Sequence, residues 1–335
     1  MNAHVALLAS TLLASTLITA SLITGTANAA LPGYTFTDLG TLGGDYSYAR
    51  AINASGQVAG YAYTTGGNYH ATLWNGTTAT DLGTLGGTSS VANAINASGQ
   101  VAGYAYTTGG ISHATLWNGT TATDLGTLGG TYSSANAINA SGQVAGYAYT
   151  TGGAAHATLW NGTTATDLKT LGGYSDLPPE ATAINDSGQI VGYSNTTGGY
   201  SHATLWNGTT VTDLGTLGGY TSHAYAINAS GQVVGDADIT GNVRHATLWD
   251  GTTAIDLNSL LDASTLSAGW VLNSANGIND NGWITGDASN SLLGIVSHAY
   301  LLSVSSVPEP ETYGMMLAGL GMLGFMVRRR KTDQA

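Results

Sequence analysis

Short runs of alternating apolar and polar residues, separated by turn residues, recur along residues 34–302. In the first complete copy they predict four strands, at residues 48–53, 57–63, 70–74 and 77–82. The connection Asn53-Ala54-Ser55-Gly56 and the dipeptide Asn75-Gly76 are hairpin signals, because their residues tolerate positive φ. Four strands in about 43 residues are the unit of a β-propeller blade.

Three short motifs recur once in each of six repeats: Asp-Leu from Asp38 to Asp256, in steps of 43, 43, 43, 46 and 43 residues, Ile-Asn from Ile52 to Ile278, and His-Ala from His70 to His298. The array opens with a lone fourth strand at residues 34–39 and closes with a lone third strand at residues 298–302. We therefore expect an all-β fold, a six-bladed β-propeller of four-stranded antiparallel blades. The N-terminal strand would complete the last blade and remove two sheet edges. One short helix is expected at residues 258–262.

Each predicted third strand begins with a His, and each fourth strand has an Asp as its penultimate residue. Counting outward from the Asn-Gly hairpins places the two directly opposite, within reach of a charge-assisted hydrogen bond. A shared metal ion needs ligands about 2 Å away, whereas neighbouring third strands lie at least roughly 10 Å apart. We interpret the pairs as structural and expect no metal or cofactor. They are His70 with Asp81, His113 with Asp124, His156 with Asp167, His202 with Asp213, His245 with Asp256 and, through ring closure, His298 with Asp38.

The N-terminal segment has the features of an export signal. Residues 5–25 are apolar or small and carry no charge, and Ala27-Asn28-Ala29 places small residues at the −3 and −1 positions of a cleavage site. This pattern predicts a secretory signal peptide at residues 1–29, followed by the repeat domain at 30–306. An uncleaved membrane anchor is the alternative, because the segment before the apolar run has no Lys or Arg.

Three elements follow the repeats in order: Val307-Pro308-Glu309-Pro310, an apolar stretch at 313–327, and the basic cluster Arg328, Arg329, Arg330 and Lys331. This arrangement, at residues 307–331, resembles the PEP-CTERM sorting signal of Gram-negative bacteria. The resemblance implies recognition by an exosortase-type membrane protease and cleavage near Pro-Glu-Pro. The apolar stretch would span about 22 Å as a helix, which suits transient anchoring in the inner membrane before release to the cell surface or extracellular matrix.

The repeat units resemble the HAF family of extracellular repeats through His-Ala-x-Leu-Trp, Asp-Leu-Gly-Thr-Leu-Gly-Gly and Ile-Asn-x-x-Gly-Gln-Val. The third position of the first motif is Thr in five copies and Tyr300 in the sixth, so the Phe of the family name is absent. The resemblance covers residues 34–302 and implies localisation and architecture more than chemistry.

Composition removes several classes of function. The chain has no Cys, which excludes disulfides and thiolate zinc sites. Residues 30–306 hold three basic residues, Arg50, Lys169 and Arg244, against sixteen acidic ones, a net charge of about −13. Such a charge opposes binding to a phosphate backbone, so nucleic acid is not an expected partner.

These features favour a non-catalytic surface or matrix protein that contributes structure or binds extracellular polysaccharide. The repeated Trp residues are interpreted as packing between blades rather than as sugar platforms, whereas loop tyrosines fit either role. A secreted glycan- or peptide-acting enzyme and a protein-binding scaffold are the alternatives. Any ligand site is expected where the repeats lose symmetry, at Tyr174, Asp176, Glu180, Asp236, Asp238 and Arg244.

Overall fold

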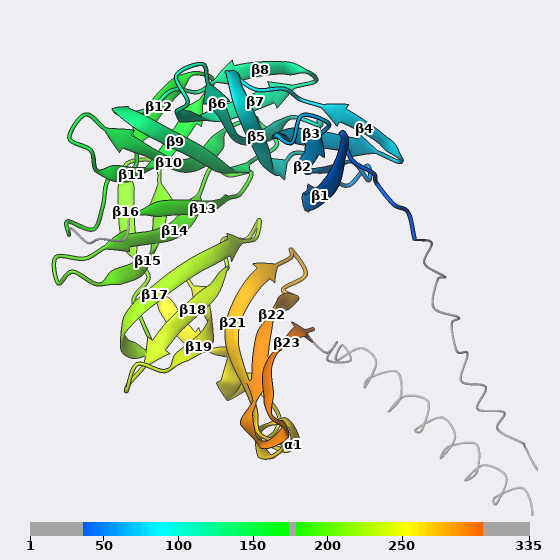
Figure 1. Cartoon of the computed structure of the whole chain (residues 1–335). Coiled ribbons are helices and arrows are strands. Elements are labelled where there is room, and N and C mark those ends of the chain that lie inside the picture. Colours follow the sequence, from blue (N-terminus) through cyan, green and yellow to red (C-terminus); the bar gives the residue numbers. More distant parts are fainter. Residues whose placement is uncertain (1–35, 174–178, 304–335) are drawn as a thin grey trace, which may run out of the picture. The chain divides into compact units, whose positions relative to one another are not determined.

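The computed structural model describes residues 36–173 and 179–303, and their regular structure is almost entirely antiparallel β-sheet (Figure 1). Six sheets follow one another along the chain, each a meander of consecutive strands. The first three are β1 (Gly43–Ile52), β2 (Val58–Thr64), β3 (Tyr69–Asn75) and β4 (Thr78–Asp81); β5 (Gly86–Ile95), β6 (Val101–Thr107), β7 (Ser112–Asn118) and β8 (Thr121–Asp124); and β9 (Gly129–Ile138), β10 (Val144–Thr150), β11 (Ala155–Asn161) and β12 (Thr164–Asp167). The last three are β13 (Glu180–Ile184), β14 (Ile190–Asn195), β15 (Ser201–Asn207) and β16 (Thr210–Asp213); β17 (Gly218–Ile227), β18 (Val233–Ile239), β19 (Arg244–Asp250) and β20 (Thr253–Asp256); and β21 (Trp270–Ile278), β22 (Ile284–Asn290) and β23 (Ile295–Leu302).

The sixth sheet departs from the prediction, because it has three strands where the other five have four. Residues 36–41 form no strand, and within the described part of the chain no strand pairs with the outer edge of β23. Completion of the last sheet by the N-terminal strand is therefore not observed. The predicted helix is present but begins one residue earlier, as the 3₁₀ helix η1 (Leu257–Leu260). It is followed by α1 (Ala263–Ser267), while η2 (Ser291–Leu293) precedes β23.

The hairpin between the third and fourth strands has a different register from the one predicted. Asn75 pairs with Thr78 and Trp74 with Ala79, so the two turn residues are Gly76 and Thr77. Gly76 has φ +58°, and it occupies the first turn position, where a two-residue hairpin loop of the glycine-first class needs positive φ. The shift amounts to two residues, which keeps every side chain on its predicted face of the sheet.

Every innermost strand contains a β-bulge near its C-terminal end. In β1, Ala49 pairs with Gly60 and Ala51 with Ala59, so the residue between them is extra. A glycine opposite the bulge is required in each sheet, because a Cβ on Gly60 would lie 2.0 Å from the Tyr48 carbonyl oxygen. The six extra residues are Arg50, Asn93, Asn136, Thr182, Tyr225 and Asn276, which we call the bulge row.

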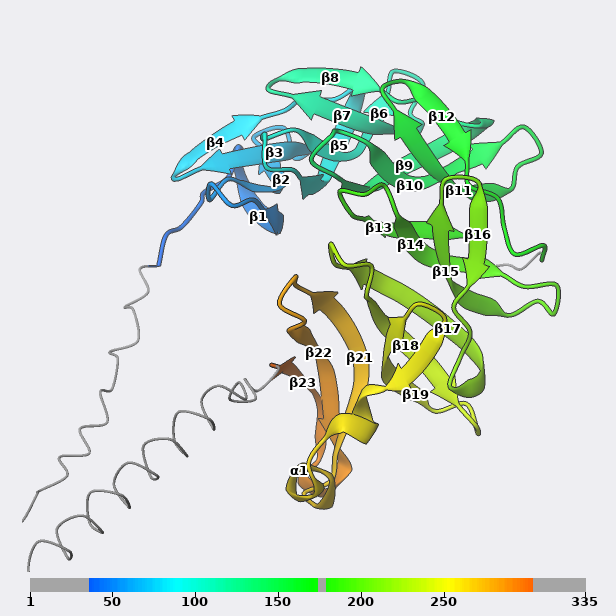
Figure 2. The same ribbon diagram turned by 180° about the vertical axis from the view of Figure 1, so that it is seen from behind.

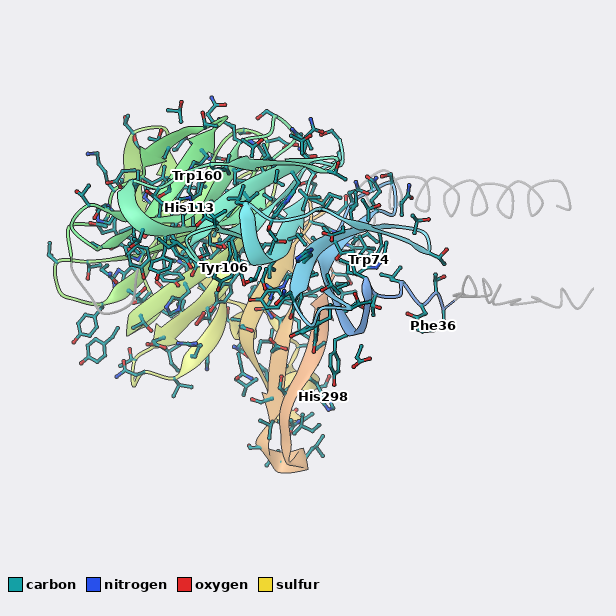
Figure 3. The ribbon with its side chains drawn as sticks, turned by 45° about the horizontal axis from the view of Figure 1, so that its top comes forward. Phe36, Trp74, Tyr106, His113, Trp160 and His298 are labelled. Atoms are coloured by element: carbon teal, nitrogen blue, oxygen red, sulfur yellow. The ribbon has the colours of Figure 1, made fainter. Side chains whose placement is uncertain are left out.

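The hydrophobic core lies between successive sheets. The sheets themselves can be followed in Figure 2. At the first interface, Ala59, Ala71 and Leu82 of one sheet pack against Val101 and Trp117 of the next. The same arrangement repeats at the next three interfaces, and at the last one Leu302 stands at the position of the Trp. All five repeat tryptophans are at most 1% exposed, Trp74 and Trp160 in Figure 3 among them. The packing interpretation of the Trp set is confirmed, because side chains so deeply buried offer no face to a sugar.

Polar side chains tie neighbouring sheets together and explain the constant Ile-Asn motif. The Asn53 Oδ1 atom accepts from the Gln57 backbone N at 3.0 Å, which closes its own turn. Its Nδ2 atom donates to the Asn96 carbonyl in the next sheet at 3.2 Å. Equivalent bonds run from sheet to sheet as far as Asn228 and Asn279. The motif is therefore a structural ladder between turns.

The segments expected to be apolar helices, residues 5–25 and 313–327, lie outside the described residues, as do the cleavage site and the Pro-Glu-Pro motif. Within residues 36–173 and 179–303, no helix has the length and hydropathy needed to cross a membrane.

Candidate functional site

Five of the six predicted His–Asp pairs are brought together by the third and fourth strands. The imidazole Nδ1 atoms lie 2.8–2.9 Å from Asp Oδ2. His113, a member of one such pair, is labelled in Figure 3. The paired backbone position of Asp81 is Thr72 rather than His70, so the two side chains meet diagonally on one face. The other carboxylate oxygen of Asp81 accepts from the Gly83 backbone N at 2.7 Å. Each Asp thus holds both its strand partner and the following turn.

The sixth pair is absent, and this corrects the prediction that joined the two ends of the array. The Asp38 Oδ1 atom accepts from the Gly40 backbone N at 3.0 Å, as its equivalents do in the other repeats. The His298 ring instead lies 5.8 Å from that of Trp270. Asp38 and His298 are both described, and no hydrogen bond or ion pair joins them, since the sixth sheet has no fourth strand to carry the Asp.

The bulge row is the best candidate for a ligand site, because a β-bulge re-aims one side chain and is often found beside binding sites. The flanking residues are constant, Ala on one side and Ala or Gly on the other, while the bulged residue varies. Arg50, Asn93 and Asn136 line a polar hollow of about 360 Å³. Arg50 Nη1 donates to Asn93 Oδ1 at 3.1 Å, and the Asn93 amide donates to the Ala135 carbonyl at 2.8 Å.

Glu180 continues this line of polar contacts into the fourth sheet. Asn136 Nδ2 donates to Glu180 Oε1 at 2.7 Å, and the Tyr193 hydroxyl donates to Oε2 at the same distance. Burial and the adjoining Glu180 raise the pKa of Tyr193 well above its usual range. The Tyr193 ring also meets the His223 ring edge-on, with 4.9 Å between the centroids. Both Glu180 oxygens are therefore engaged by neutral donors.

The fifth sheet holds a second ionic group, centred on Asp236, which is 1% exposed. Arg244 Nε donates to one of its oxygens at 2.8 Å, and the Tyr225 hydroxyl donates to the other at 2.5 Å. His223 Nδ1 is buried 3.5 Å from Asp236 and makes no hydrogen bond. Burial and the neighbouring carboxylate raise the pKa of Tyr225. The charge of Asp236 is thus compensated inside the sheet.

Half-buried tyrosines accompany the bulge row on the second strands. Arg50 lies over the Tyr61 ring, 5.4 Å from its centroid. Burial raises the pKa of Tyr104 and of Tyr147, the latter also through Glu180. Burial likewise raises the pKa of Tyr69 to about 12. The phenols of Tyr69, Tyr104 and Tyr147 therefore stay neutral at physiological pH and can act as hydrogen-bond donors and flat apolar surfaces.

Of the residues predicted for ligand binding, the structure brings together Asp236 and Arg244 and places Glu180 beside them through Tyr193 and His223. Asp238 is the cross-strand partner of Arg244, but its carboxylate accepts from the Thr221 hydroxyl at 2.6 Å. Tyr174 and Asp176 lie outside the described residues. Sequence reasoning missed Arg50, Tyr193, His223 and Tyr225. The bulged residues Arg50 and Tyr225 could have been found from the sequence. Each is a variable residue between two small residues that are nearly constant from repeat to repeat.

Several of the tyrosines expected in loops are exposed, as a binding role would require, but Tyr132 lies in strand β9 and Tyr220 in strand β17. Tyr132 is 46% exposed, and Tyr200 and Tyr220 stack on each other with centroids 4.7 Å apart. Among the described residues, no group of three or more His, Cys, Asp or Glu is placed to hold a metal ion.

Residues 306–331 match the PEP-CTERM protein-sorting motif, so the chain carries at its C-terminus a signal that implies export. No curated protein matches the chain at significance. Among solved structures, TolB from Acinetobacter baumannii aligns with a TM-score of 0.42 and 13% identity, covering 71% of this chain and 61% of that one, so the chain spans less than two thirds of TolB. The β-propeller domain of the trilobed protease from Pyrococcus furiosus gives 0.43 and 9%, covering 79% and 100%. A six-bladed fungal lectin from Aleuria aurantia gives 0.32 and 14%, covering 76% and 91%.

Proposed function

We propose that the chain is an exported, non-catalytic repeat protein of the cell surface or extracellular matrix that binds polysaccharide. Its repeats would be HAF-type blades of a propeller. An exosortase-type membrane protease would recognise the C-terminal motif while the adjoining apolar stretch anchors the chain transiently in the inner membrane. The sorting motif at residues 306–331 carries the localisation part of the proposal.

The bulge row carries the binding part. A constant frame presents one variable side chain per sheet, and the first three of these line a polar hollow. Polysaccharide recognition uses such a combination of amide and guanidinium donors with flat tyrosine rings. The half-buried Glu180 and the buried Asp236 are both engaged by protein donors, as expected for a site that binds rather than cleaves.

The direct test is retention of extracellular polymer from the producing cells by the immobilised full-length protein. We expect retention to fall when Asn93 and Asn136 are both replaced by Ala, because the hollow loses its amides. The control is Ser55→Ala, because Ser55 is an exposed turn residue that does not line the hollow. This variant should leave retention unchanged. No retention of any cell polymer by the unaltered protein would contradict the binding role.

A secreted enzyme acting on glycans or peptides is the second candidate, favoured by the proximity of Glu180, His223 and Asp236 in neighbouring sheets. Its test is product release from cell polymer by the full-length protein and by Glu180→Gln. Turnover that disappears in this variant would favour the enzyme over the binding protein.

A further inference from the structure

Arg50 is the charged member of the bulge row, and its charge is not compensated by the protein. The described part of the chain contains three basic residues, of which Arg244 is paired with Asp236. Arg50 and Lys169 have no carboxylate within ion-pair distance among the described residues. Arg50 lines the hollow together with Asn93 and Asn136.

The guanidinium of Arg50 is held in place while most of its donors remain free. It has five N–H groups, and one hydrogen bond to a described residue, from Nη1 to Asn93 Oδ1, is formed. The Tyr61 ring supports it from below at 5.4 Å. The residue is exposed, so the remaining donors face solvent at the hollow. A planar cation that is preoriented in this way suits bidentate binding of a carboxylate.

The geometry points to a carboxylate-bearing sugar as the ligand of the hollow formed by Arg50, Asn93 and Asn136. This inference rests on the proposed polysaccharide binding and names the chemical class of the sugar. The overall charge limits the ligand further. Because the repeat region carries about −13, a polymer charged at every sugar would be repelled, so acidic sugars separated by neutral ones are the better fit.

The repeats supply closely matched variants. Arg50→Asn introduces the residue found at the same bulge in the second and third sheets, so it should preserve the fold while removing the charge. Lys169→Gly removes the other uncompensated positive charge. It restores the residue found at the equivalent turn position, where Lys169 has φ +63° and Gly83 has φ +74°. Both variants therefore remove one positive charge, Arg50→Asn at the hollow and Lys169→Gly at a turn.

The experiment is calorimetric titration of the full-length protein in detergent with a glucuronate-bearing xylo-oligosaccharide and with the same compound after reduction of its carboxyl group. We expect the acidic compound to bind at least about 10-fold more tightly than the reduced one, as one charge-assisted bidentate contact provides. Arg50→Asn should abolish this preference, and Lys169→Gly should keep it. Thermal unfolding of each variant checks that the fold is retained.

The outcomes separate this inference from the proposed function. Equal binding of the two compounds by the unaltered protein, or an unchanged preference in Arg50→Asn, would overturn the assignment of a carboxylate to Arg50. So would the absence of binding to either compound. In each of these cases, retention of cell polymer in the separate assay would leave the proposed polysaccharide binding standing.

Discussion

The second and fifth sheets share one backbone and present different chemistry. Val91 pairs with Tyr104 in the second sheet as His223 pairs with Asp236 in the fifth, and both sheets have the bulge at the next-but-one residue. Their cores use the same Ala, Val and Trp positions. Around the bulge, however, the second sheet has Val91, Asn93, Tyr104 and Ser112, whereas the fifth has His223, Tyr225, Asp236 and Arg244.

The comparison separates the residues that make the sheet from those that give it chemistry. The glycine opposite the bulge is the same in both sheets, since the backbone leaves no room for a Cβ there, and Ala92 and Ala105 correspond to Ala224 and Ala237. The four positions around the bulge exchange neutral for ionic groups without altering the strand pairing. We therefore expect substitutions in the frame to cost the same in both sheets, and substitutions around the bulge to depend on their neighbours.

The largest effect is expected for Gly103→Ala and Gly235→Ala. A Cβ at these positions would lie 2.0 and 1.9 Å from the carbonyl oxygens of Val91 and His223, so the paired strands must separate. We expect each change to lower the free energy of unfolding by about 4 kcal/mol or more, measured by denaturant titration. Gly109→Ala is the control, because its nearest neighbour would be at 3.7 Å. Unequal losses in the two sheets would contradict a shared frame.

The sequence predicted the sheets well because their pattern has period two and repeats. The strands, the face of each side chain and five His–Asp contacts follow from that pattern. The hairpin register was wrong by two residues, since Asn75-Gly76 and Gly76-Thr77 are both plausible turns. The contact survived, because a shift of two keeps His70 and Asp81 on one face.

The candidate site was harder to predict, because its contacts cross between sheets. Asn136 meets Glu180 from the third to the fourth sheet, and Tyr193 meets His223 from the fourth to the fifth. Such contacts depend on how the sheets stack, which local periodicity does not specify. The bulge at Arg50 could likewise not be predicted from the alternation of apolar and polar residues, because a bulge adds one residue that interrupts this alternation. The predicted contact between Asp38 and His298 was wrong for a related reason, because it required two strands far apart in the sequence to pair.

The next effect concerns the buried carboxylate of the fifth sheet. Asp236→Asn should lower the free energy of unfolding by about 2 kcal/mol, because the ion pair with Arg244 is lost while the amide stays buried. A fourfold variant that installs the second-sheet residues, His223→Val, Tyr225→Asn, Asp236→Tyr and Arg244→Ser, should recover most of this loss. Denaturant titration measures both. If the fourfold variant loses as much free energy of unfolding as its four single substitutions added together, the residues of the second sheet cannot replace those of the fifth on this backbone.

A smaller effect should appear at alkaline pH. The folded-state pKa values of Tyr193 and Tyr225 lie above the ordinary value of 10.0, mainly through burial and then through Glu180 and Asp236. Above about pH 10 the unfolded chain therefore loses these phenolic protons first, and stability falls as the pH rises. The loss should be below about 1.4 kcal/mol per pH unit for each group, since both remain partly solvated.

Replacing Tyr193 by Phe should reduce this alkaline slope, because one of the phenols whose pKa is raised by burial is removed. Thermal unfolding between pH 8 and 11 provides the measurement, and Tyr132→Phe is the control, since that side chain is 46% exposed. An unchanged slope in Tyr193→Phe would mean that burial of this phenol does not control the alkaline loss of stability.

The smallest effect distinguishes a His–Asp pair within a complete sheet from the two residues expected to close the array. His113 Nδ1 lies 2.8 Å from Asp124, whereas Asp38 bonds only to the Gly40 backbone and His298 contacts Trp270. A double-mutant cycle on His113→Gln and Asp124→Asn should give a coupling energy of about 0.5 kcal/mol, as for other partly exposed ion pairs. The same cycle on His298→Gln and Asp38→Asn should give additive effects, because no shared hydrogen bond is removed. A coupling at the second pair as large as at the first would show that the two residues do meet in solution, and hence that the sixth sheet gains a fourth strand there.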